Sequence, residues 1–336
     1  HSDSSASGSD AKPYAHIAAM RSIQEHLDRK QVAAKVESAA EAKGCNRVRY
    51  TLPITQPSVE IIIPTRDGLE LLRQCLISIV NKTTYQNYVI TIIDNGSVES
   101  DTLSYLQEIT RDQRIRVKRD DSPFNFSALN NRVGLKSTAD FVLLLNNDIE
   151  VINTDWLTEM VSVATQPGVG CVGARLWYPN DTLQHGGLIY GLGGVVAHSH
   201  KQLKRGLPGY AGRVLHRQTL SGVTGACLLI SQHIYKEVSG LNENFKVAYN
   251  DVDFCLRVME AGYRNVWTPF ADLYHHESAT RGYEDTPEKR ERLQTEATLL
   301  GELWGNKLHV DPFYSPNLTL DSEDFSMAWP PRVATY

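Results

Sequence analysis

Carboxylates follow two apolar stretches of the chain in a way that core packing does not require. Asp148 comes after the run Phe-Val-Leu-Leu-Leu at 141–145 and two asparagines. A short, unbroken apolar run favours a strand that is buried on both faces, and open α/β sheets place ligands outside the carboxyl ends of such strands. We therefore predict Asp148 at the mouth of a cleft, where its carboxylate suits a divalent cation that prefers oxygen ligands.

Asp94 ends the apolar run at 88–94 and is followed by Asn-Gly-Ser. A carboxylate there can accept a hydrogen bond from a nucleotide base or from a ribose hydroxyl. The alternative is a plain turn from strand to helix, in which Asp-Asn-Gly is common. Neither a GxGxxG fingerprint after the first strand nor a GxxxxGK[ST] loop is present, so the sequence does not favour Rossmann-type dinucleotide binding or a P-loop.

The segment Asn-Asp-Val-Asp-Phe-Cys-Leu-Arg at 250–257 predicts a helix over 250–261, capped by Asn250. Asp253 and Arg257 are four residues apart, so we expect a structural ion pair between them. Asp251 falls in the first turn, where the helix dipole favours the ionised carboxylate, and such a group in a cleft can act as a general base. The alternative for Asp251 is an ordinary acidic residue at a helix start.

Histidines form a second group of candidates. His275 and His276 follow the last predicted strand, and because neighbouring strand residues face opposite ways, only one of them should point into a site and bind metal beside Asp148. The alternative is a structural histidine. A glycine-rich segment is interpreted, together with Gly225-Ala226, as a wall on the acceptor side; it contains His185, His198 and His200. Just before it stand Arg175, Trp177 and Tyr178, whose side chains suit stacking on a sugar or hydrogen bonding to one. The alternative for these side chains is ordinary loop packing.

Strands alternate with helical patterns over the first half of the chain, which predicts a parallel sheet with right-handed crossovers. Expected strands are 59–65, 88–94, 115–119, 141–145, 169–177, 226–230 and 266–275. Expected helices are 14–43 (one helix or a pair, stopped by Gly44), a helix after each of the first two strands, 125–135, 156–164, 250–261 and 287–304. Residues 178–220 are expected to form a long loop or small hairpins, and the proline-containing tail is expected to wrap the domain.

The bulk composition narrows the class of protein. The chain has 336 residues, 34 basic and 39 acidic side chains and a net charge of −5, which gives no basic excess for nucleic acid. No apolar run approaches the roughly 20 residues that span a bilayer, and no signal peptide is evident. The five cysteines are scattered without a CxxC pair, as expected for reduced core residues. These features favour a cytoplasmic protein.

Taken in order, five motifs resemble those of a family 2 glycosyltransferase of the GT-A fold. They are Ile-Ile-Ile-Pro-Thr-Arg-Asp, Ile-Ile-Asp-Asn-Gly-Ser, Leu-Leu-Leu-Asn-Asn-Asp, Asn-Asp-Val-Asp-Phe-Cys-Leu-Arg and His-His-Glu-Ser. The resemblance covers about residues 57–285 and is greatest to the bacterial branch that builds O-antigen and related surface polysaccharides, including rhamnosyltransferases. Pro-Phe-Asn-Phe-Ser-Ala-Leu-Asn-Asn and the Glu-Asp-Phe-Ser of the tail are also typical of that branch.

The resemblance implies an α/β GT-A domain at 56–285, with a Rossmann-like, mostly parallel central sheet flanked by helices. An N-terminal tail and helical arm at 1–55 and a C-terminal helix and wrapping tail at 286–336 complete the expected organisation. The matching motifs make Asp251 the catalytic base and Asp148 and His275 the metal ligands, with Asn250 replacing the acid that usually precedes the base. They assign donor nucleotide-sugar binding to Thr65, Arg66, Asp67, Asp94, Asn130, Asn146 and Asn147.

The activity that the resemblance implies is inverting, Mn²⁺- or Mg²⁺-dependent sugar transfer. The donor would be a UDP-, dTDP- or GDP-sugar, and the acceptor a hydroxyl of a growing surface glycan. A lipid-linked acceptor would bring the cytoplasmic enzyme to the inner membrane face as a peripheral protein. The helical arm suggests a homodimer contact or a link to further domains. Two rivals are a sugar nucleotidyltransferase, disfavoured because Pro-Thr-Arg-Asp-Gly lacks a glycine-rich phosphate loop, and a non-catalytic carbohydrate-binding or scaffold module.

Overall fold

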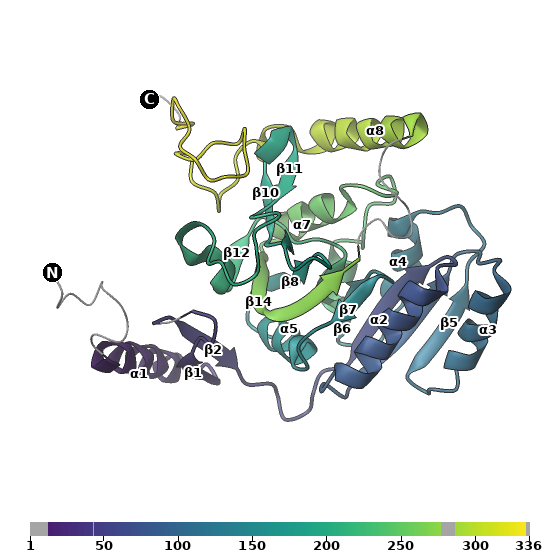
Figure 1. The fold of residues 1–336 in the computed structure, drawn as a ribbon, viewed down its shortest axis with the longest axis horizontal. Coiled ribbons are helices and arrows are strands. Elements are labelled where there is room, and N and C mark those ends of the chain that lie inside the picture. The colour runs from purple at the N-terminus through teal and green to yellow at the C-terminus, as the bar shows by residue number, and fades with distance from the viewer. Residues whose placement is uncertain (1–12, 43, 277–285, 334–336) are drawn as a thin grey trace.

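A curved central sheet organises the molecule (Figure 1). The computed structural model describes residues 13–42, 44–276 and 286–333. The strand order is β12-β14-β8-β13-β6-β3-β4-β5, in which β12 is the short edge strand Gln218–Leu220, and the stretch β6-β3-β4-β5 is parallel throughout. β13 lies antiparallel between β6 and β8, while β14 is parallel to β8. The main strands are β3 (Val59–Thr65), β4 (Tyr88–Asp94), β5 (Ile115–Arg119), β6 (Phe141–Leu145), β8 (Val169–Trp177), β13 (Cys227–Ser231) and β14 (Arg264–His275).

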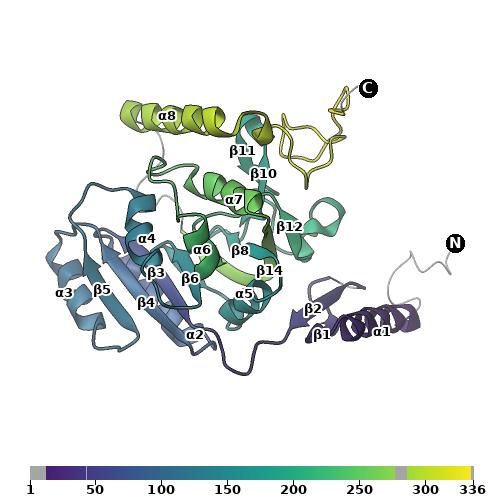
Figure 2. The same cartoon turned by 180° about the vertical axis from the view of Figure 1, so that it is seen from behind.

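Helices cover both faces of this sheet, which explains the unbroken apolar strands. Side chains alternate between faces along a strand. Ile61 and Leu143 therefore pack in one core with helices α2 and α5, whereas Ile62 and Leu144 pack in a second core with α4 and α7. Figure 2 shows α4, α6 and α7 in front of the sheet seen from behind. The bounds are α2 (Leu69–Lys82), α3 (Ser100–Ile109), α4 (Phe126–Gly134), α5 (Trp156–Ala164), α6 (Gln232–Glu237) and α7 (Asn250–Glu260).

The N-terminal arm differs from the predicted helix over 14–43. Helix α1 covers Pro13–Arg29, and the chain then forms a hairpin of β1 (Ala34–Ser38) and β2 (Asn46–Tyr50). Gly44, at φ 80°, lies in the turn of that hairpin instead of stopping a helix. The reason is visible in β2, where Arg47 and Arg49 alternate with apolar residues and reach acidic partners on and just before α5.

The glycine-rich segment folds into short strands. These are β9 (Leu183–His185), β10 (Leu188–Tyr190), β11 (Val196–His198) and β12 (Gln218–Leu220). β9 pairs antiparallel with β8, and β10 pairs antiparallel with β11, so the small-hairpin alternative is correct up to His198, whereas β12 pairs with β14. A three-residue strand, β7 (Ile149–Val151), follows the Asn-Asn-Asp motif and pairs with the end of β14. This pairing brings the carboxyl ends of β6 and β14 together.

The C-terminal part packs over the glycine-rich segment (Figure 1). Helix α8 (Pro287–Trp304) has proline in its first turn and ends at Gly305, as predicted. In the tail beyond it, the Asp311 carboxylate accepts hydrogen bonds from the amide of Tyr190 and the hydroxyl of Ser221. All five cysteines are free thiols, as expected. Within the described ranges, none of the helices combines the length and the apolar composition that crossing a bilayer requires.

Candidate active site

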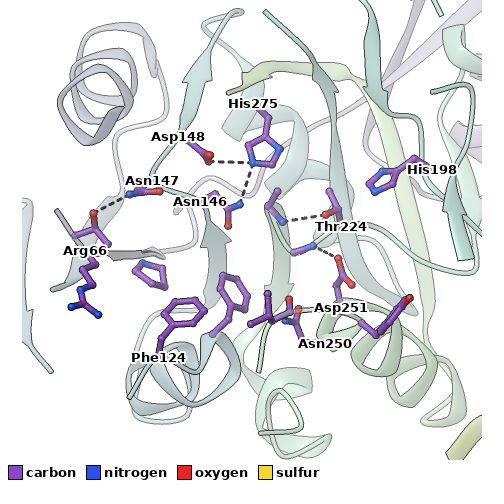
Figure 3. A pocket seen from close by; sticks show the side chains of 18 residues that line it. Arg66, Phe124, Asn146, Asn147, Asp148, His198, Thr224, Asn250, Asp251 and His275 are labelled. Atoms are coloured by element: carbon purple, nitrogen blue, oxygen red, sulfur yellow. Dashed lines mark hydrogen bonds and ion pairs between the residues drawn. The ribbon is translucent and has the colours of Figure 1, made fainter. Parts of the chain in front are cut away.

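A cavity of about 590 Å³ opens at the carboxyl ends of β3 and β6, where the sequence predicted a cleft. That volume is in the range of sites that hold small molecules and cofactors. Figure 3 shows Asp148, His275 and Asn146 grouped together, with Arg66 and Phe124 toward one side and Asp251 and His198 toward the other. The full lining is Pro64, Thr65, Arg66, Phe124, Phe126, Asn146, Asn147, Asp148, His198, Thr224, Gly225, Ala226, Val247, Ala248, Tyr249, Asn250, Asp251 and His275.

Asp148 and His275 form the most compact polar contact of the cavity. Nε2 of His275 lies 3.1 Å from Oδ1 of Asp148 and 3.1 Å from the Asn146 amide nitrogen. The other ring nitrogen, Nδ1, lies 2.7 Å from Oε1 of Gln184. The carbonyl oxygen of Gln184 can only accept a hydrogen bond, so Nδ1 of His275 carries the proton. In the neutral ring, Nε2 then has a free electron pair that can bind a cation. Gln184 therefore orients His275 as second-sphere partners orient metal-binding histidines.

This donor set fits a divalent cation. A carboxylate oxygen and an imidazole lone pair that face each other repel unless a positive charge, such as a proton or a metal ion, stands between them. Two ligands at right angles on an ion with bonds of about 2.1 Å lie about 3 Å apart, which agrees with the Asp148–His275 distance. In the described part of the chain no cluster of three or more His, Cys, Asp or Glu side chains forms a metal cage. A cation here would thus share its coordination with ligand oxygens and water, as Mg²⁺ commonly does.

His276 is separated from this pair. Its Nε2 lies 3.2 Å from Oε2 of Glu150, and it is absent from the cavity lining. The opposed directions of the two histidines follow from the alternation of side chains along an extended chain. The structure therefore brings the side chain of His275, and not that of His276, to the Asp148 carboxylate, although the backbone amide of His276 donates to the carbonyl oxygen of Asp148 at 2.9 Å. The Glu-Ser that completes the motif lies outside the described residues.

Asp251 stands on the first turn of α7 and enters the cavity from the opposite side. Its Oδ2 accepts the amide of Gly225 at 2.8 Å, and its Oδ1 accepts the amide of Val252 at 2.9 Å. Burial raises the pKa of the Asp251 carboxyl above its ordinary range, against the opposing effect of these amides and of the Thr224 side chain. A carboxylate with a raised pKa is a better proton acceptor near neutral pH than an ordinary aspartate.

Asn250 does not cap this helix, contrary to the prediction. The cap position belongs to Tyr249, whose backbone is left-handed (φ 58°), and the Asn250 amide donates to the carbonyl oxygen of Val247 at 2.9 Å. The expected pair of Asp253 and Arg257 is confirmed, with Nε 2.8 Å from Oδ2. Asp253 is thus a structural residue, while Asp251 remains the acid that faces the cavity.

The predicted donor-site residues divide into two groups. Thr65, Arg66, Asn146 and Asn147 line the cavity, and the Asn147 amide donates to Oγ1 of Thr65 at 3.0 Å. This contact joins the ends of β3 and β6. Phe124, which lies in the Pro-Phe-Asn-Phe-Ser motif, also lines the cavity, although the sequence did not single it out as a site residue.

Asp67, Asp94 and Asn130 do not line the cavity. The Asp67 carboxylate accepts the amides of Val98 and Glu99, and so ties two loops together. Asp94 is buried and accepts from Arg119 at 2.7 Å. These contacts leave both residues beside the cavity instead of in its wall.

The remaining donor-site prediction, Asn130, is fully buried within α4. Its amide donates to the carbonyl oxygen of Phe126 at 2.8 Å, which is an intrahelical contact. For Arg175 and Trp177, the packing alternative agrees with the structure. Both are buried and bonded to Asp272, whose oxygens accept from the Arg175 guanidinium at 2.6 and 2.7 Å. The polar groups of Asn130, Arg175 and Trp177 therefore form hydrogen bonds within the fold.

The glycine-rich wall is only partly as expected. His198, Gly225 and Ala226 line the cavity, whereas His200 lies outside it and stacks on Phe325 with ring centroids 4.3 Å apart. His185 is fully buried behind the wall, with Nδ1 2.9 Å from Nδ1 of His198. No local sequence signal indicated this contact or the one between Gln184 and His275, because both join segments that are distant in the chain.

The fold and site together define a GT-A glycosyltransferase domain. Among solved structures, that of GalNAc-T7 with UDP, GalNAc and Mn²⁺ matches with a TM-score of 0.63 and 13% identity, over 82% of this chain and 52% of that one. At this identity the likeness supports the fold alone. The family model for glycosyl transferase family 2 matches residues 60–239. The chain belongs to glycosyl transferase family 2.

Two curated relatives extend the similarity beyond that segment. "Uncharacterized protein y4gI" of Sinorhizobium fredii is 47% identical over 97% of this chain. The O-antigen biosynthesis protein RfbC of Myxococcus xanthus is 35% identical over 91% of it. The chain spans 36% of the length of the first relative and 24% of the second.

Proposed function

We propose that this chain transfers a sugar, with inversion, from a nucleoside-diphosphate sugar to a hydroxyl of a bacterial surface glycan of the O-antigen type. The observation that carries the proposal is the arrangement of one cavity, in which Asp148 and His275 face Asp251. A cation-type pair and a buried carboxylate base are the two chemical requirements of such a transfer. Membership of the family supports the reaction class, and the similarity to RfbC supports the O-antigen type of product.

Asp251 is proposed to take the proton of the acceptor hydroxyl. Its raised pKa suits that task, and the amides of Gly225 and Val252 fix its two oxygens in place without supplying a competing proton at the acceptor. The oxygen freed of its proton attacks the anomeric carbon from the face opposite the leaving diphosphate. The bond from that carbon to the diphosphate oxygen breaks as the new glycosidic bond forms, which inverts the configuration. Positioned base catalysis contributes roughly 10²–10⁴-fold to such a step.

Asp148 and His275 are proposed to hold Mn²⁺ or Mg²⁺, with Gln184 fixing the metal-binding tautomer of His275. When bound, such an ion supplies positive charge that offsets the charge growing on a diphosphate leaving group. Thr65 and Asn147 join the two strand ends that border this side of the cavity, and Arg66 brings a guanidinium to the same wall. The donor diphosphate is proposed to lie along this wall. Asp94 and Asp67 are proposed to border it through the loops that they stabilise.

A donor screen tests this proposal. UDP-, dTDP- and GDP-sugars are added with MnCl₂, MgCl₂ or EDTA, and both the melting temperature and the release of nucleoside diphosphate are followed. A ligand that binds only the folded chain stabilises it by about 2.7 kcal/mol at a hundredfold excess over Kd. We expect one nucleotide class to stabilise the chain only when metal is present. Stabilisation by nucleoside triphosphates and sugar phosphate instead would identify a nucleotidyltransferase, and no response to any nucleotide would favour a non-catalytic carbohydrate-binding module.

A further inference from the structure

Two histidines with no part in the proposed reaction contact each other, with nearly perpendicular rings, on the side of the cavity that holds Asp251. His198 lines the cavity, and His185 is fully buried behind it. Their Nδ1 atoms are 2.9 Å apart, and the ring planes meet at 81°. Only one of the two facing nitrogens can carry the shared proton, so one histidine donates and the other accepts. The groups around the two rings decide which histidine is the donor.

A backbone amide fixes that direction. The N–H of Thr224 donates to Nε2 of His185 at 3.2 Å, and because an amide nitrogen is always a donor, Nε2 of His185 must be unprotonated. The proton of His185 is then on Nδ1 and is donated to Nδ1 of His198. His198 must in turn carry its own proton on Nε2. Burial, which lowers the pKa of His185 well below its ordinary value, agrees with a neutral ring.

The backbone holds the two rings in this contact. His185 ends β9, and His198 ends β11, where it pairs with Leu188 of β10. The amide of Ser199 donates to the carbonyl oxygen of Gly187 at 2.8 Å, which closes the connection. At Gly186 a Cβ atom would lie 2.8 Å from the carbonyl oxygen of Ser199, so only glycine permits this close approach. The relation between the rings is therefore a property of the fold and not of one flexible side chain.

The same loop that orders the histidines also holds the proposed base. Two consecutive backbone amides make these contacts: the Thr224 amide donates to His185, and the Gly225 amide donates to Asp251 at 2.8 Å. In Figure 3, His198 and Asp251 appear toward the same side of the cavity, away from Arg66 and Phe124. If the donor lies along the wall of Arg66, the acceptor sugar enters between Asp251 and His198.

We propose that His198 is an acceptor-binding residue, which donates from Nε2–H to a hydroxyl or ring oxygen of the acceptor sugar, and that His185 is the residue that positions it. This inference rests on the proposed function and deepens it. Because Nδ1 of His198 already accepts the proton of His185, His198 does not compete with Asp251 for the proton of the acceptor. It orients the sugar and selects acceptors that have an oxygen at that place.

The tautomers are tested first, on the full chain labelled with ¹⁵N. Two-bond ¹H–¹⁵N correlation spectra distinguish Nδ1–H from Nε2–H in each imidazole. We expect Nε2–H in His198 and Nδ1–H in His185. In His185→Phe, the donor to Nδ1 of His198 is lost and the share of the Nε2–H tautomer of His198 should fall, whereas His185→Asn, which keeps an N–H near the Nδ1 position, should restore it. A proton on Nδ1 of His198 in the unaltered chain would overturn the proposal.

Kinetics with named probes test the acceptor role. The acceptors are n-octyl α-L-rhamnoside, β-D-galactoside and β-D-glucoside, and hydrolysis of the donor without acceptor is measured in parallel. His198→Phe should raise the acceptor KM roughly 3- to 10-fold, the range that one neutral hydrogen bond contributes. His198→Gln, which keeps an N–H near the Nε2 position, should recover most of the affinity. His233→Phe is the matched control, because His233 is exposed on α6.

These measurements distinguish the role of His198 from the proposed transferase activity. An acceptor KM that is the same in His198→Phe and in the unaltered chain would overturn the role of His198 and leave the transferase intact. Absence of donor hydrolysis in the unaltered chain would overturn the proposed function, and the acceptor role with it.

Discussion

Nε2 of His275 faces Oδ1 of Asp148 at 3.1 Å, and the two side chains come from the ends of strands β14 and β6. A distance of about 3 Å is what two neighbouring ligands of one octahedral ion require. The short strand β7 explains why the chain can hold it, because Ile149 pairs with His275 directly after Asp148. The proposed metal site is therefore built on paired strand ends of the sheet.

The first prediction concerns this pair. His275→Ala and Asp148→Asn should each abolish the Mn²⁺-dependent thermal stabilisation by the nucleoside diphosphate that the donor screen identifies. His276→Ala is the matched control, since His276 contacts Glu150 outside the cavity and should retain the effect. Equal loss in all three variants would show that the effect is structural and would remove His275 from the proposed role.

Gln184 gives a second prediction. Its carbonyl oxygen accepts the Nδ1 proton of His275 at 2.7 Å, so Gln184→Leu should lower Mn²⁺ affinity by roughly 10- to 100-fold, as for other second-sphere partners of metal ligands. Gln184→Glu retains an acceptor for the same proton and should bind Mn²⁺ at least as tightly as the unaltered chain. Titration calorimetry with MnCl₂ alone measures both. Unchanged affinity in Gln184→Leu would refute this orienting role.

The third prediction concerns Asp251 and pH. Asp251→Asn should lower the transfer rate by roughly 10²–10⁴-fold, while the thermal shift caused by donor and metal is unchanged. Because burial raises the pKa of Asp251, its carboxylate is protonated at a higher pH than an ordinary aspartate. The transfer rate should therefore fall as pH decreases through that raised pKa, and the residual rate of Asp251→Asn should lack this limb. Rates are measured from pH 4 to 8 at saturating donor. A normal rate in the variant would assign the base elsewhere.

The sequence predicted the sheet well because buried strands require apolar residues on both faces. Runs such as 88–94 and 141–145 allow few other structures, and the acids at or just after their ends, Asp94 and Asp148, lie at the predicted edge of the sheet. The arm at 14–43 was only partly predicted. Its first half is helical, but residues 34–38 are stabilised by pairing with 46–50 and by arginine contacts to α5, which local periodicity does not reveal.

The site was harder to predict, because the same residue type serves the fold and the cavity. Asp94 ends one buried strand and Asp148 closely follows another, yet Asp94 accepts a hydrogen bond from Arg119, while Asp148 faces His275 within the cavity. For Arg175 and Trp177 the sequence left sugar binding and packing open, and both residues contact Asp272 inside the fold. The difference depends on which partner tertiary folding brings near, and that partner is distant in the chain in each case.

The last prediction concerns how the N-terminal hairpin is joined to the domain. Glu159 of α5 is buried and accepts hydrogen bonds from Arg47 of β2, from Arg217 and from Thr268. Burial alone would raise the pKa of Glu159, but Arg217 and Arg47 outweigh it and hold the pKa below the usual value. Replacing one member of a buried ion cluster leaves uncompensated charge and costs about 3–5 kcal/mol.

Glu159→Gln should therefore lower the free energy of unfolding by about that amount at pH 7, as measured in urea. Glu41→Gln is the matched control: Glu41 pairs with Arg175 at 2.9 Å but is 60% exposed, so its loss should cost less than about 1 kcal/mol. A folded-state pKa below the unfolded value means that the contribution of Glu159 is complete above the unfolded value and is lost as pH falls through the folded one. The difference between Glu159→Gln and the unaltered chain should thus persist at pH 5 and shrink only well below the usual glutamate pKa. A difference that vanished already between pH 7 and 5 would contradict the lowered pKa.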